Sequence, residues 1–274
     1  MERFDLHMHT TSSPDGNNTP YEMAVAAKDL GVNIISITEH YDAMETYPPG
    51  TFFEQEGRLF TIDEKKLDRD FNYARENCPK GIILINGIEL GQIQFQKQAS
   101  FDFCERHNFD YIIGSMHNLR DDIDIGALDF NIEKPKRILK NYLDDMLELC
   151  ACGGFDGLGH IDFPFRYIPP NLVEYTYKGF EPEIDLILRS IISQNILIEI
   201  NGAGLRKFPK QIGPEKWVLK RFIELGLEAI TFGSDAHSAS QLMLGFNESI
   251  ELARSAGIKY AAYFIERKPV YIKL

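Results

Sequence analysis

The sequence predicts an α/β protein with a single domain, a distorted TIM-like (β/α)7 barrel formed by residues 1–274. Two observations predict this fold. Seven short apolar runs alternate with helical patterns, as in a parallel sheet whose neighbouring strands are joined by helical crossovers. Chemically capable side chains also stand at or just past the end of each run. An open doubly wound sheet is an alternative, but it would leave its edge strands remote, so convergence of all these side chains favours a closed ring.

The seven apolar runs predict the strands, because most of them are short, rich in β-branched residues and bounded by Gly, Asn or Asp. Alternate side chains of a strand face opposite ways, so Asp5, His7 and His9 share one face of the first strand. Its other face is apolar, which indicates helices outside the strand and a polar centre inside. The expected strands cover residues 3–9, 32–40, 81–90, 109–117, 155–163, 195–201 and 227–237, and a last run at 268–274 is expected to add an edge strand.

The helices between these strands have recognisable ends. Thr19, Pro20 and Glu22 supply a capping residue, a proline in the first turn and a capping-box glutamate, and Gly31 ends this helix. The helix at 61–78 lies within an insertion at 41–80, which the sequence leaves open as either a lid over the site or a surface helix. Further helices are expected at 133–154, 181–195 and 213–226.

The composition is that of a globular protein, with 44% hydrophobic and 26% charged residues and no apolar run long enough to span a membrane. The net charge of −12 and the absence of long Lys/Arg runs argue against nucleic acid or an anionic membrane as a partner. The first residues do not resemble a secretory signal, so we expect a cytoplasmic protein. The four cysteines contain no CxxC pair and are expected to be reduced and structural.

Six of the seven histidines stand at predicted strand ends, and only His107 lies elsewhere. A single histidine in such a place is more often a hydrogen-bonded structural residue than a ligand. Here carboxylates accompany the histidines, and this joint pattern predicts a metal centre at the C-terminal end of the barrel. In chain order the groups are His7, His9, Asp15, His40, Glu89, His117, His160, Glu199, Asn201, Asp235 and His237.

Short motifs around these residues resemble those of the PHP (polymerase and histidinol phosphatase) superfamily and come in the family's order. They are HMHT (7–10), ITEH (37–40), GIEL (87–90), GSMH (114–117), GHID (159–162) and GSDAH (233–237). Two longer stretches, GHIDFPFRY (159–167) and EINGAGLRKFPKQIGP (199–214), are similar to segments of the histidinol-phosphate phosphatase type. The resemblance implies a distorted barrel of seven units that holds two to three divalent ions, usually zinc, manganese or iron.

The same resemblance implies which residues hold the ions. Glu89 would bridge two of them, since a carboxylate has two oxygens. Asp15 departs from the many members that have histidine there, and its hard oxygen favours manganese or iron over zinc alone. The first ion would be bound by His7, His9, Glu89 and Asp235, the second by Glu89, His117 and His160, and the third by Asp15, His40 and His237.

The resemblance also implies the reaction, which is the hydrolysis of L-histidinol phosphate to L-histidinol and phosphate in histidine biosynthesis. Hydroxide generated at the ions would attack the phosphorus of this small phosphomonoester. Arg166 and Arg206 are expected to bind the phosphate, because a guanidinium donates two parallel hydrogen bonds. Catalytic roles are expected for Glu89 and, at the leaving group, for His237 or Asp162.

Other polar residues have less certain roles at this stage. Asp5 and Glu39 are candidates for holding ligand imidazoles in one tautomer. Acidic and aromatic side chains would suit the ammonium and imidazole of histidinol, and the candidates are Asp162, Glu199, Phe163 and Tyr167. Two alternatives stay open: a phosphoesterase for another small phosphorylated metabolite or nucleotide, and a non-catalytic PHP module that docks onto a polymerase. Because every expected ligand position carries a capable residue, the pattern favours an enzyme over such a module.

Overall fold

The computed structural model describes residues 2–42, 54–55, 58–59, 62–120, 123–207 and 210–274. The largest sheet of these residues has nine strands, and neighbours pair in parallel except for the last two. In sheet order they are β1 (Phe4–Asp5), β2 (Ile34–Asp42), β5 (Ile83–Gly91), β6 (Tyr111–Ser115), β9 (Gly157–Leu158), β10 (Leu197–Asn201), β11 (Ala229–Gly233), β12 (Tyr260–Ile265) and β13 (Lys268–Lys273). Two short antiparallel pairs stand apart, β3 (Glu54–Gln55) with β4 (Arg58–Leu59), and β7 (Asn118–Leu119) with β8 (Ile123–Asp124).

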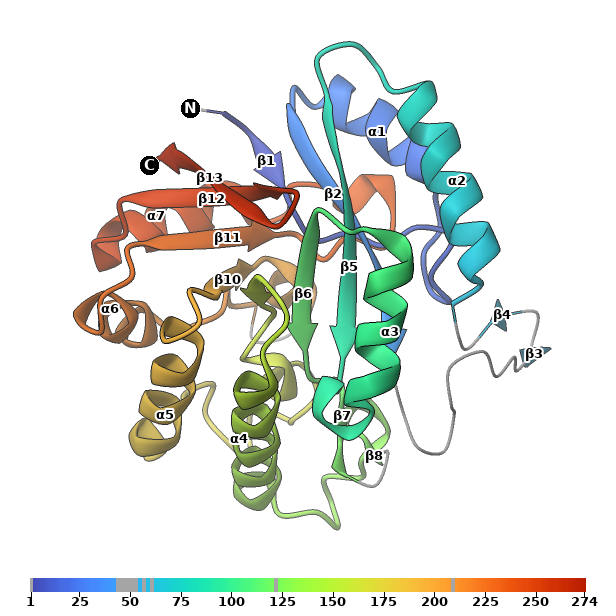
Figure 1. The fold of residues 1–274 in the computed structure, drawn as a ribbon. Helices are drawn as coiled ribbons and strands as arrows, with labels where there is room; N and C mark the ends of the chain where they lie inside the picture. Colours follow the sequence, from blue (N-terminus) through green and yellow to red (C-terminus); the bar gives the residue numbers. More distant parts are fainter. Residues whose placement is uncertain (1, 43–53, 56–57, 60–61, 121–122, 208–209) are drawn as a thin grey trace.

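The main sheet closes into a ring where the segment that follows β1 runs beside the end of β11 and the residues after it. Leu6 N donates to Phe232 O at 2.9 Å, and His9 N donates to Ala236 O at 2.7 Å. The first two residues of β11, Ala229 and Ile230, pair instead with β12, so the ring is distorted at this point. Figure 1 shows β1 between β2 and the β12–β13 pair. The predicted distorted (β/α)7 barrel is therefore confirmed.

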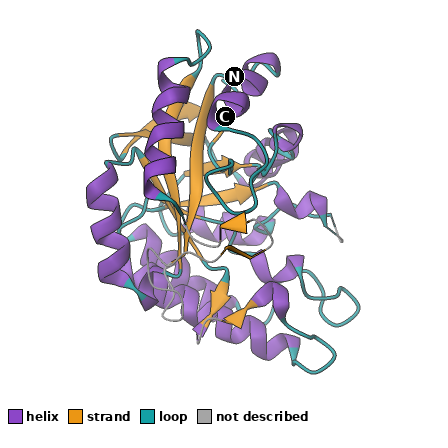
Figure 2. Ribbon diagram, turned by 90° about the vertical axis from the view of Figure 1, so that its right-hand side faces the viewer, coloured by secondary structure: helices purple, strands orange, loops and turns teal. Residues whose placement is uncertain are grey.

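Helices surround the strands, as Figures 1 and 2 show. The five predicted helical segments form, although most are slightly shorter than expected, and α3 and α7 lie outside the predicted ranges. In the described ranges, every helix is too short or too polar to traverse a lipid bilayer. The helices are α1 (Pro20–Asp29), α2 (Glu64–Glu76), α3 (Lys97–His107), α4 (Pro135–Cys152), α5 (Glu181–Ile192), α6 (Lys216–Glu224) and α7 (Phe246–Ala256).

The hydrophobic core fills the space between the strands and these helices, and its buried members run from Phe4 to Ile272. Aromatic rings tie the first strand to the last βα unit. The ring of Phe4 meets that of Phe232 edge-on at 6.4 Å and that of Phe246 at 5.4 Å. Side chains thus support the same closure that the main-chain hydrogen bonds make.

The β12–β13 hairpin lies against the N-terminal ends of the barrel strands. Its turn is made by Glu266 and Arg267, which have φ values of 48° and 62°. Arg267 Nε donates to Asp156 Oδ2 at 2.5 Å and Nη2 donates to Gly154 O at 2.9 Å, just before β9 begins. The edge strand predicted at 268–274 is confirmed as β13, whereas β12 was not predicted.

The insertion predicted at 41–80 is only partly included in the structure. Residues 43–53, 56–57 and 60–61 lie outside the described residues, and with them the open choice between a lid and a surface segment. Its helix at 61–78 is confirmed as α2, which lies beside α1 (Figure 1).

Candidate metal centre

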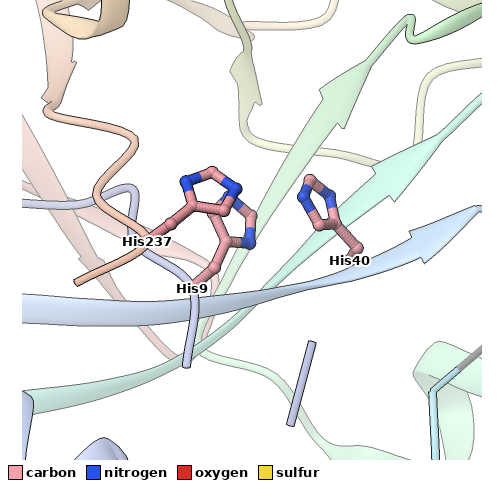
Figure 3. A group of neighbouring side chains, drawn as sticks. All are labelled: His9, His40 and His237. Atoms are coloured by element: carbon pink, nitrogen blue, oxygen red, sulfur yellow. The ribbon is translucent and has the colours of Figure 1, made fainter. Parts of the chain in front are cut away.

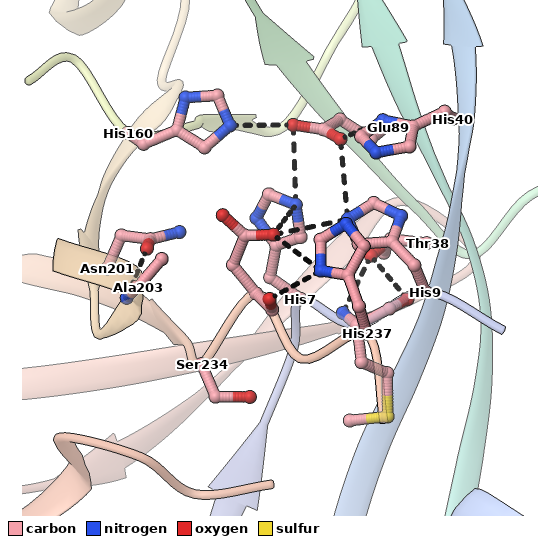
Figure 4. Close-up of polar contacts among 12 residues, drawn as sticks. His7, His9, Thr38, His40, Glu89, His160, Asn201, Ala203, Ser234 and His237 are labelled. Atoms are coloured by element: carbon pink, nitrogen blue, oxygen red, sulfur yellow. Dashed lines mark hydrogen bonds and ion pairs between the residues drawn. The ribbon is translucent and has the colours of Figure 1, made fainter. Parts of the chain in front are cut away.

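The C-terminal ends of the barrel strands bring most of the predicted ligands together around Glu89. The parallel register of β2 and β5 pairs His40 directly with Glu89, so both side chains start at the same level of the barrel. Oε1 of Glu89 lies 2.9 Å from His160 Nε2 and 3.3 Å from both His7 Nε2 and His117 Nε2. Figure 4 shows the Glu89 carboxylate between His160 and His40. A single buried carboxylate thus meets imidazoles from several strands.

The second oxygen of Glu89 faces another pair of histidines. Its Oε2 lies 2.7 Å from His40 Nδ1 and 3.6 Å from His9 Nε2. Asp235, which follows β11, approaches from the opposite side, with its Oδ1 3.4 Å from His9 Nε2 and 4.0 Å from His7 Nε2. The two early histidines therefore lie between two carboxylates.

The third predicted group, Asp15, His40 and His237, lies toward solvent. His237 Nε2 is 2.9 Å from Asp15 Oδ2, and His40 Nε2 is 3.8 Å from Asp15 Oδ1. The ring of His9 stacks on that of His40 with centroids 3.9 Å apart and lies 4.4 Å from that of His237. Figure 3 shows these three imidazoles gathered from three different segments.

The donor atoms fit divalent cations. Several buried ring nitrogens have no hydrogen-bond partner among the described residues, including Nε2 of His7 and both nitrogens of His9. Buried polar atoms are nearly always paired in proteins, so unpaired imidazole nitrogens beside carboxylates indicate a metal site. In the part of the chain that the structure describes, four sets have ligand atoms within 4.8 Å of one another: His9–His40–His237, His7–His9–Glu89, His7–His160–Asp235 and His40–Glu89–His117. These sets divide the residues differently from the predicted three ions, so which residue serves which ion stays a prediction.

The charge states of three of these groups, Glu89, Asp235 and His9, also suit metal binding. Burial opposes ionisation of Glu89, but neighbouring imidazoles, first that of His7, hold the pKa of its carboxyl well below the usual range. Burial likewise opposes ionisation of Asp235, yet the Arg166 guanidinium keeps the pKa of that carboxyl well below its usual value. Burial and two adjacent imidazoles lower the pKa of His9 well below its ordinary value, so its ring is neutral and offers a lone pair.

Glu199 orients the first histidine. His7 Nδ1 lies 2.8 Å from Glu199 Oε1, which fixes the ring so that Nε2 is available to a ligand. The other oxygen accepts from His160 N and from Asn201 Nδ2, both at 2.9 Å. Gly233 makes this contact possible, because a Cβ there would lie 2.4 Å from Glu199 Oε1. Both oxygens are buried and paired, which favours the orientation of His7 as the role of Glu199, and its candidacy for the organic half of the substrate stays a prediction.

Asp42 holds His117 in the same way, and the sequence analysis missed it. His117 Nδ1 lies 2.8 Å from Asp42 Oδ1, and Gln92 Nε2 donates to the same oxygen at 3.0 Å. Gln92 Oε1 in turn accepts from His117 N at 2.8 Å. Gly91 leaves the space for this carboxylate, because a Cβ there would lie 1.8 Å from Asp42 Oδ1. The available signal was strand alternation, since Asp42 follows His40 by two residues and shares its face of β2.

Asp5 and Glu39 do not hold ligand imidazoles, so that prediction is wrong. Asp5 lies one strand level below the histidines and accepts from the main-chain amides of Ser234 at 2.9 Å and Met243 at 2.8 Å. Glu39 precedes a ligand histidine on β2, and its side chain therefore faces away from the cluster. It accepts from Thr10 N at 3.0 Å and also from the Thr10 hydroxyl. Both carboxylates instead fix the loops that carry ligands.

The two predicted phosphate-binding arginines converge on Asp235. Arg166 Nη1 donates to Asp235 Oδ2 at 2.7 Å, and its Nη2 donates to Asn201 Oδ1 at 2.9 Å. Arg206 Nη1 donates to Ser234 O at 2.9 Å, and its Nη2 donates to Asp235 O at 2.7 Å. Arg166 thus reaches a side chain of the cluster, whereas Arg206 holds the main chain of the loop after β11. Their contact with phosphate stays a prediction.

The two candidates for assisting the leaving group have different surroundings. Besides its contact with Asp15, His237 donates from Nδ1 to Asp235 O at 2.9 Å. Asp162 is buried, and its Oδ2 accepts from the hydroxyl of Tyr175. Within the described residues its side-chain hydrogen bond therefore joins it to Tyr175 and not to a predicted ligand. Which of the two assists the leaving group stays a prediction.

Aromatic rings line one side of the cluster. The ring of Phe163 lies 5.1 Å from the rings of both His117 and His160. Tyr167 follows at 5.2 Å from Phe163, and the ammonium of Lys207 stands 3.9 Å above the Tyr167 ring. The sequence analysis named both aromatic residues but not Lys207. An aromatic wall with a cation at its outer end thus adjoins the histidines.

Known proteins resemble the chain over most of its length. The family described as PHP domain matches residues 5–203. A probable histidinol-phosphatase of Clostridium acetobutylicum is 30% identical over 93% of this chain and 94% of its own. A histidinol-phosphatase of Lactococcus lactis is 26% identical over 96% of this chain and 95% of its own. The crystal structure of histidinol phosphate phosphatase from Lactococcus lactis, complexed with zinc, L-histidinol and phosphate, superposes with a TM-score of 0.83 at 24% identity, covering 98% of this chain and 99% of that one.

Proposed function

The chain belongs to the PHP domain family, and on this premise we propose that it is a metal-dependent phosphomonoesterase that hydrolyses L-histidinol phosphate to L-histidinol and phosphate. The observation that carries the proposal is the Glu89 carboxylate, whose two oxygens face imidazoles from separate segments within 3.6 Å. The relatives named histidinol-phosphatase, which align with nearly the whole chain, support the choice of substrate.

We further propose that two to three divalent ions are the resident cofactors, with zinc, manganese and iron as candidates. Zinc is named in the crystal structure of the Lactococcus lactis protein, which has the same fold. Divalent ions at this position supply neutralisation of the phosphoryl charge and a water acidic enough to act as nucleophile at neutral pH. The proposed ligands are the nine predicted ones, His7, His9, Asp15, His40, Glu89, His117, His160, Asp235 and His237.

The chain's own residues prepare the site for a dianionic substrate. Glu199 and Asp42 fix the orientation of two imidazoles, so that their Nε2 atoms point to Glu89. Arg166 is buried beside the cluster and brings a permanent positive charge to the place where phosphate oxygens would lie. Arg206 holds the loop after β11, so part of its proposed contribution to phosphate binding is to keep this loop in place.

Proton transfer and recognition of the organic group involve residues on the open side of the cluster. His237, whose side chain is 22% exposed, is the proposed proton donor to the leaving alkoxide, with Asp162 as the alternative. The imidazole of histidinol would stack on Phe163 or Tyr167, because flat aromatic rings pack favourably against one another, as these two rings already do. Glu89 remains the proposed bridging carboxylate.

A substrate panel with metal-loaded protein tests the proposal. We expect L-histidinol phosphate to exceed nucleotide monophosphates and other small phosphate esters by about 100-fold in kcat/KM, because only it matches the aromatic wall. Protein treated with a chelator should be inactive and should regain activity with zinc or manganese. Equal turnover of all esters would favour the general phosphoesterase. No turnover and no bound metal would favour the non-catalytic module.

A further inference from the structure

Asp15 is the most exposed of the nine proposed ligands. Its side chain is 47% exposed, whereas those of the other eight are at most 22% exposed. Its carboxylate forms ion pairs with His40 and His237, which are themselves proposed ligands. An aspartate side chain is short, so the place of this carboxylate depends on the main chain that carries it. We call residues 10–18 the Asp15 loop.

The Asp15 loop folds back on itself. Thr11 N donates to Asn18 O at 2.9 Å, and Ser13 N donates to Thr10 O at 2.8 Å. Gly16 packs directly on this turn, because a Cβ there would lie 1.9 Å from Thr10 O. The loop is therefore compact, and a shift of residues 10–13 would move Asp15 with it.

Glu39 fixes one side of residues 10–13 from beneath. This fully buried carboxylate accepts from Thr10 N at 3.0 Å and from the hydroxyls of Thr10 and Ser13. The Ser13 hydroxyl in turn accepts from His40 N at 3.0 Å. The loop is thus joined to the strand that carries another proposed ligand of the third ion.

Lys66 fixes the other side from α2. Its ammonium donates to Thr11 O and lies 3.3 Å from the hydroxyl oxygens of Thr11 and Ser12. It also pairs with Asp70 Oδ2 at 3.0 Å, one helical turn further along α2. An ammonium has three protons, and this arrangement gives each of them an acceptor. Lys66 therefore connects the helix of the insertion to the Asp15 loop.

We propose that Lys66 is a positioning residue for the third ion, because it holds the Asp15 loop in the place that presents the Asp15 carboxylate. The inference rests on the proposed metal centre and adds to it the role of α2. A plain surface ion pair with Asp70 contributes little to stability and would not require contacts with the loop. The contacts of Lys66 with Thr11 and Ser12 are the ones that would hold the Asp15 loop at the site.

Titration of metal-free protein with Mn²⁺, with the free ion followed by electron paramagnetic resonance, tests this role. In Lys66→Met the weakest binding step should lose affinity about tenfold, as is typical when a group that supports a ligand is removed. The tighter steps should be unchanged, and Lys66→Arg should restore most of the loss because it keeps the charge and the donors. Lys65→Met is the matched control, since Lys65 is the exposed neighbour on the same helix.

The outcomes separate this inference from the proposed function. A Lys66→Met protein that binds Mn²⁺ like Lys65→Met at every step would overturn the inference alone. A wild-type protein that binds no Mn²⁺ or Zn²⁺ would overturn the metal centre and the inference together. Should Lys66→Met fail to fold, Asp70→Asn removes the carboxylate that holds the ammonium and should weaken the same step less. An unchanged step in Asp70→Asn would then count against the inference.

Discussion

The geometry and the charge state of each residue in the cluster depend on its neighbours. Glu89 and His40 are partners in the register of adjacent strands, and the 2.7 Å between Glu89 Oε2 and His40 Nδ1 follows from that register. The low pKa of the Glu89 carboxyl requires the imidazoles around it, because burial alone would raise it. The function of each group therefore depends on the complete set, and removing one member should affect all.

His9 offers the clearest test of a single ligand. His9→Ala should abolish turnover while leaving the fold largely intact, because it removes a donor atom and little core volume. Turnover of histidinol phosphate and circular dichroism would measure the two effects. His107→Ala is the control, since His107 pairs with Glu64 and Asp68 on α2 and not with the cluster. A His9→Ala enzyme with near wild-type turnover would contradict the assignment of the site.

Glu199 tests the residues that orient ligands. Glu199→Gln keeps the shape of the side chain, but one of its two acceptor oxygens becomes a donor and faces a donor of His7, His160 or Asn201. We expect turnover to fall about 10- to 100-fold, with a matching loss of metal affinity. Steady-state kinetics and metal analysis would measure both. Unchanged values would show that the orientation of His7 does not depend on this carboxylate.

At this scale the sequence predicted the convergence of the proposed ligands better than the residues that support them. The ligand positions follow from strand ends, and the structure brings together His7, His9 and Glu89 as that rule requires. The supports depend on which strand lies next to which, and this is why Asp42 was missed. Glu39 was misplaced because its side chain faces away from the imidazoles, and only the fold of residues 10–13 gives it partners.

Among the elements, α1 shows how local sequence signals determine a helix. The Thr19 hydroxyl accepts from Glu22 N at 3.2 Å, and Glu22 Oε2 accepts from Thr19 N at 2.8 Å, which completes the predicted capping box. Such signals act within a few residues and need no tertiary information. They are therefore the part of the fold that a single sequence predicts most directly.

Loss of this cap should have a measurable cost. Thr19→Ala is expected to lower the free energy of unfolding by about 1 kcal/mol, because the Glu22 amide loses its partner. The melting temperature should fall by about 2–4 °C. Thr19→Ser retains the hydroxyl and should melt close to the wild type. Equal melting of the alanine and serine variants would show that the cap does not contribute.

The length of a strand depends on the neighbouring strands with which it pairs, and for this reason two strands are shorter than the sequence predicted. The run at 3–9 has strand-like alternation, yet β1 ends at Asp5. Beyond it Leu6 N and His9 N donate to Phe232 O and Ala236 O, while Met8 O still accepts from Thr38 N of β2. The run at 155–163 gives only β9, since the chain turns at His160 to place its ring beside Glu89. In both cases the site, and not the propensity of the run, decides where regular pairing stops.

For the molecule as a whole, the barrel separates chemistry from stability. The ligands gather at the C-terminal ends of the strands, while Arg267 of the β12–β13 turn binds Asp156 at the other end. The β12–β13 hairpin was predicted only in part, because β12 carries no local signal that distinguishes it from a helix, and its pairing with β11 depends on the tertiary fold. The prediction of a closed barrel succeeded because the polar residues at the ends of several predicted strands all indicated one common site.

Removing the ions should destabilise the entire molecule. The cluster buries two carboxylates that are proposed ligands, Glu89 and Asp235, among imidazoles with unpaired nitrogens, and a cation satisfies these groups only in the folded state. Binding to the native state alone contributes about 2.7 kcal/mol at a ligand concentration 100 times Kd, which corresponds to about 5–10 °C in melting temperature. Addition of a chelator should lower the melting temperature by that amount, and excess zinc or manganese should restore it.

The melting temperature of His9→Ala should fall less when the chelator is added, because this variant binds the ions more weakly from the start. An identical melting temperature with and without chelator in the wild type would mean that the histidines and carboxylates pair among themselves and hold no metal.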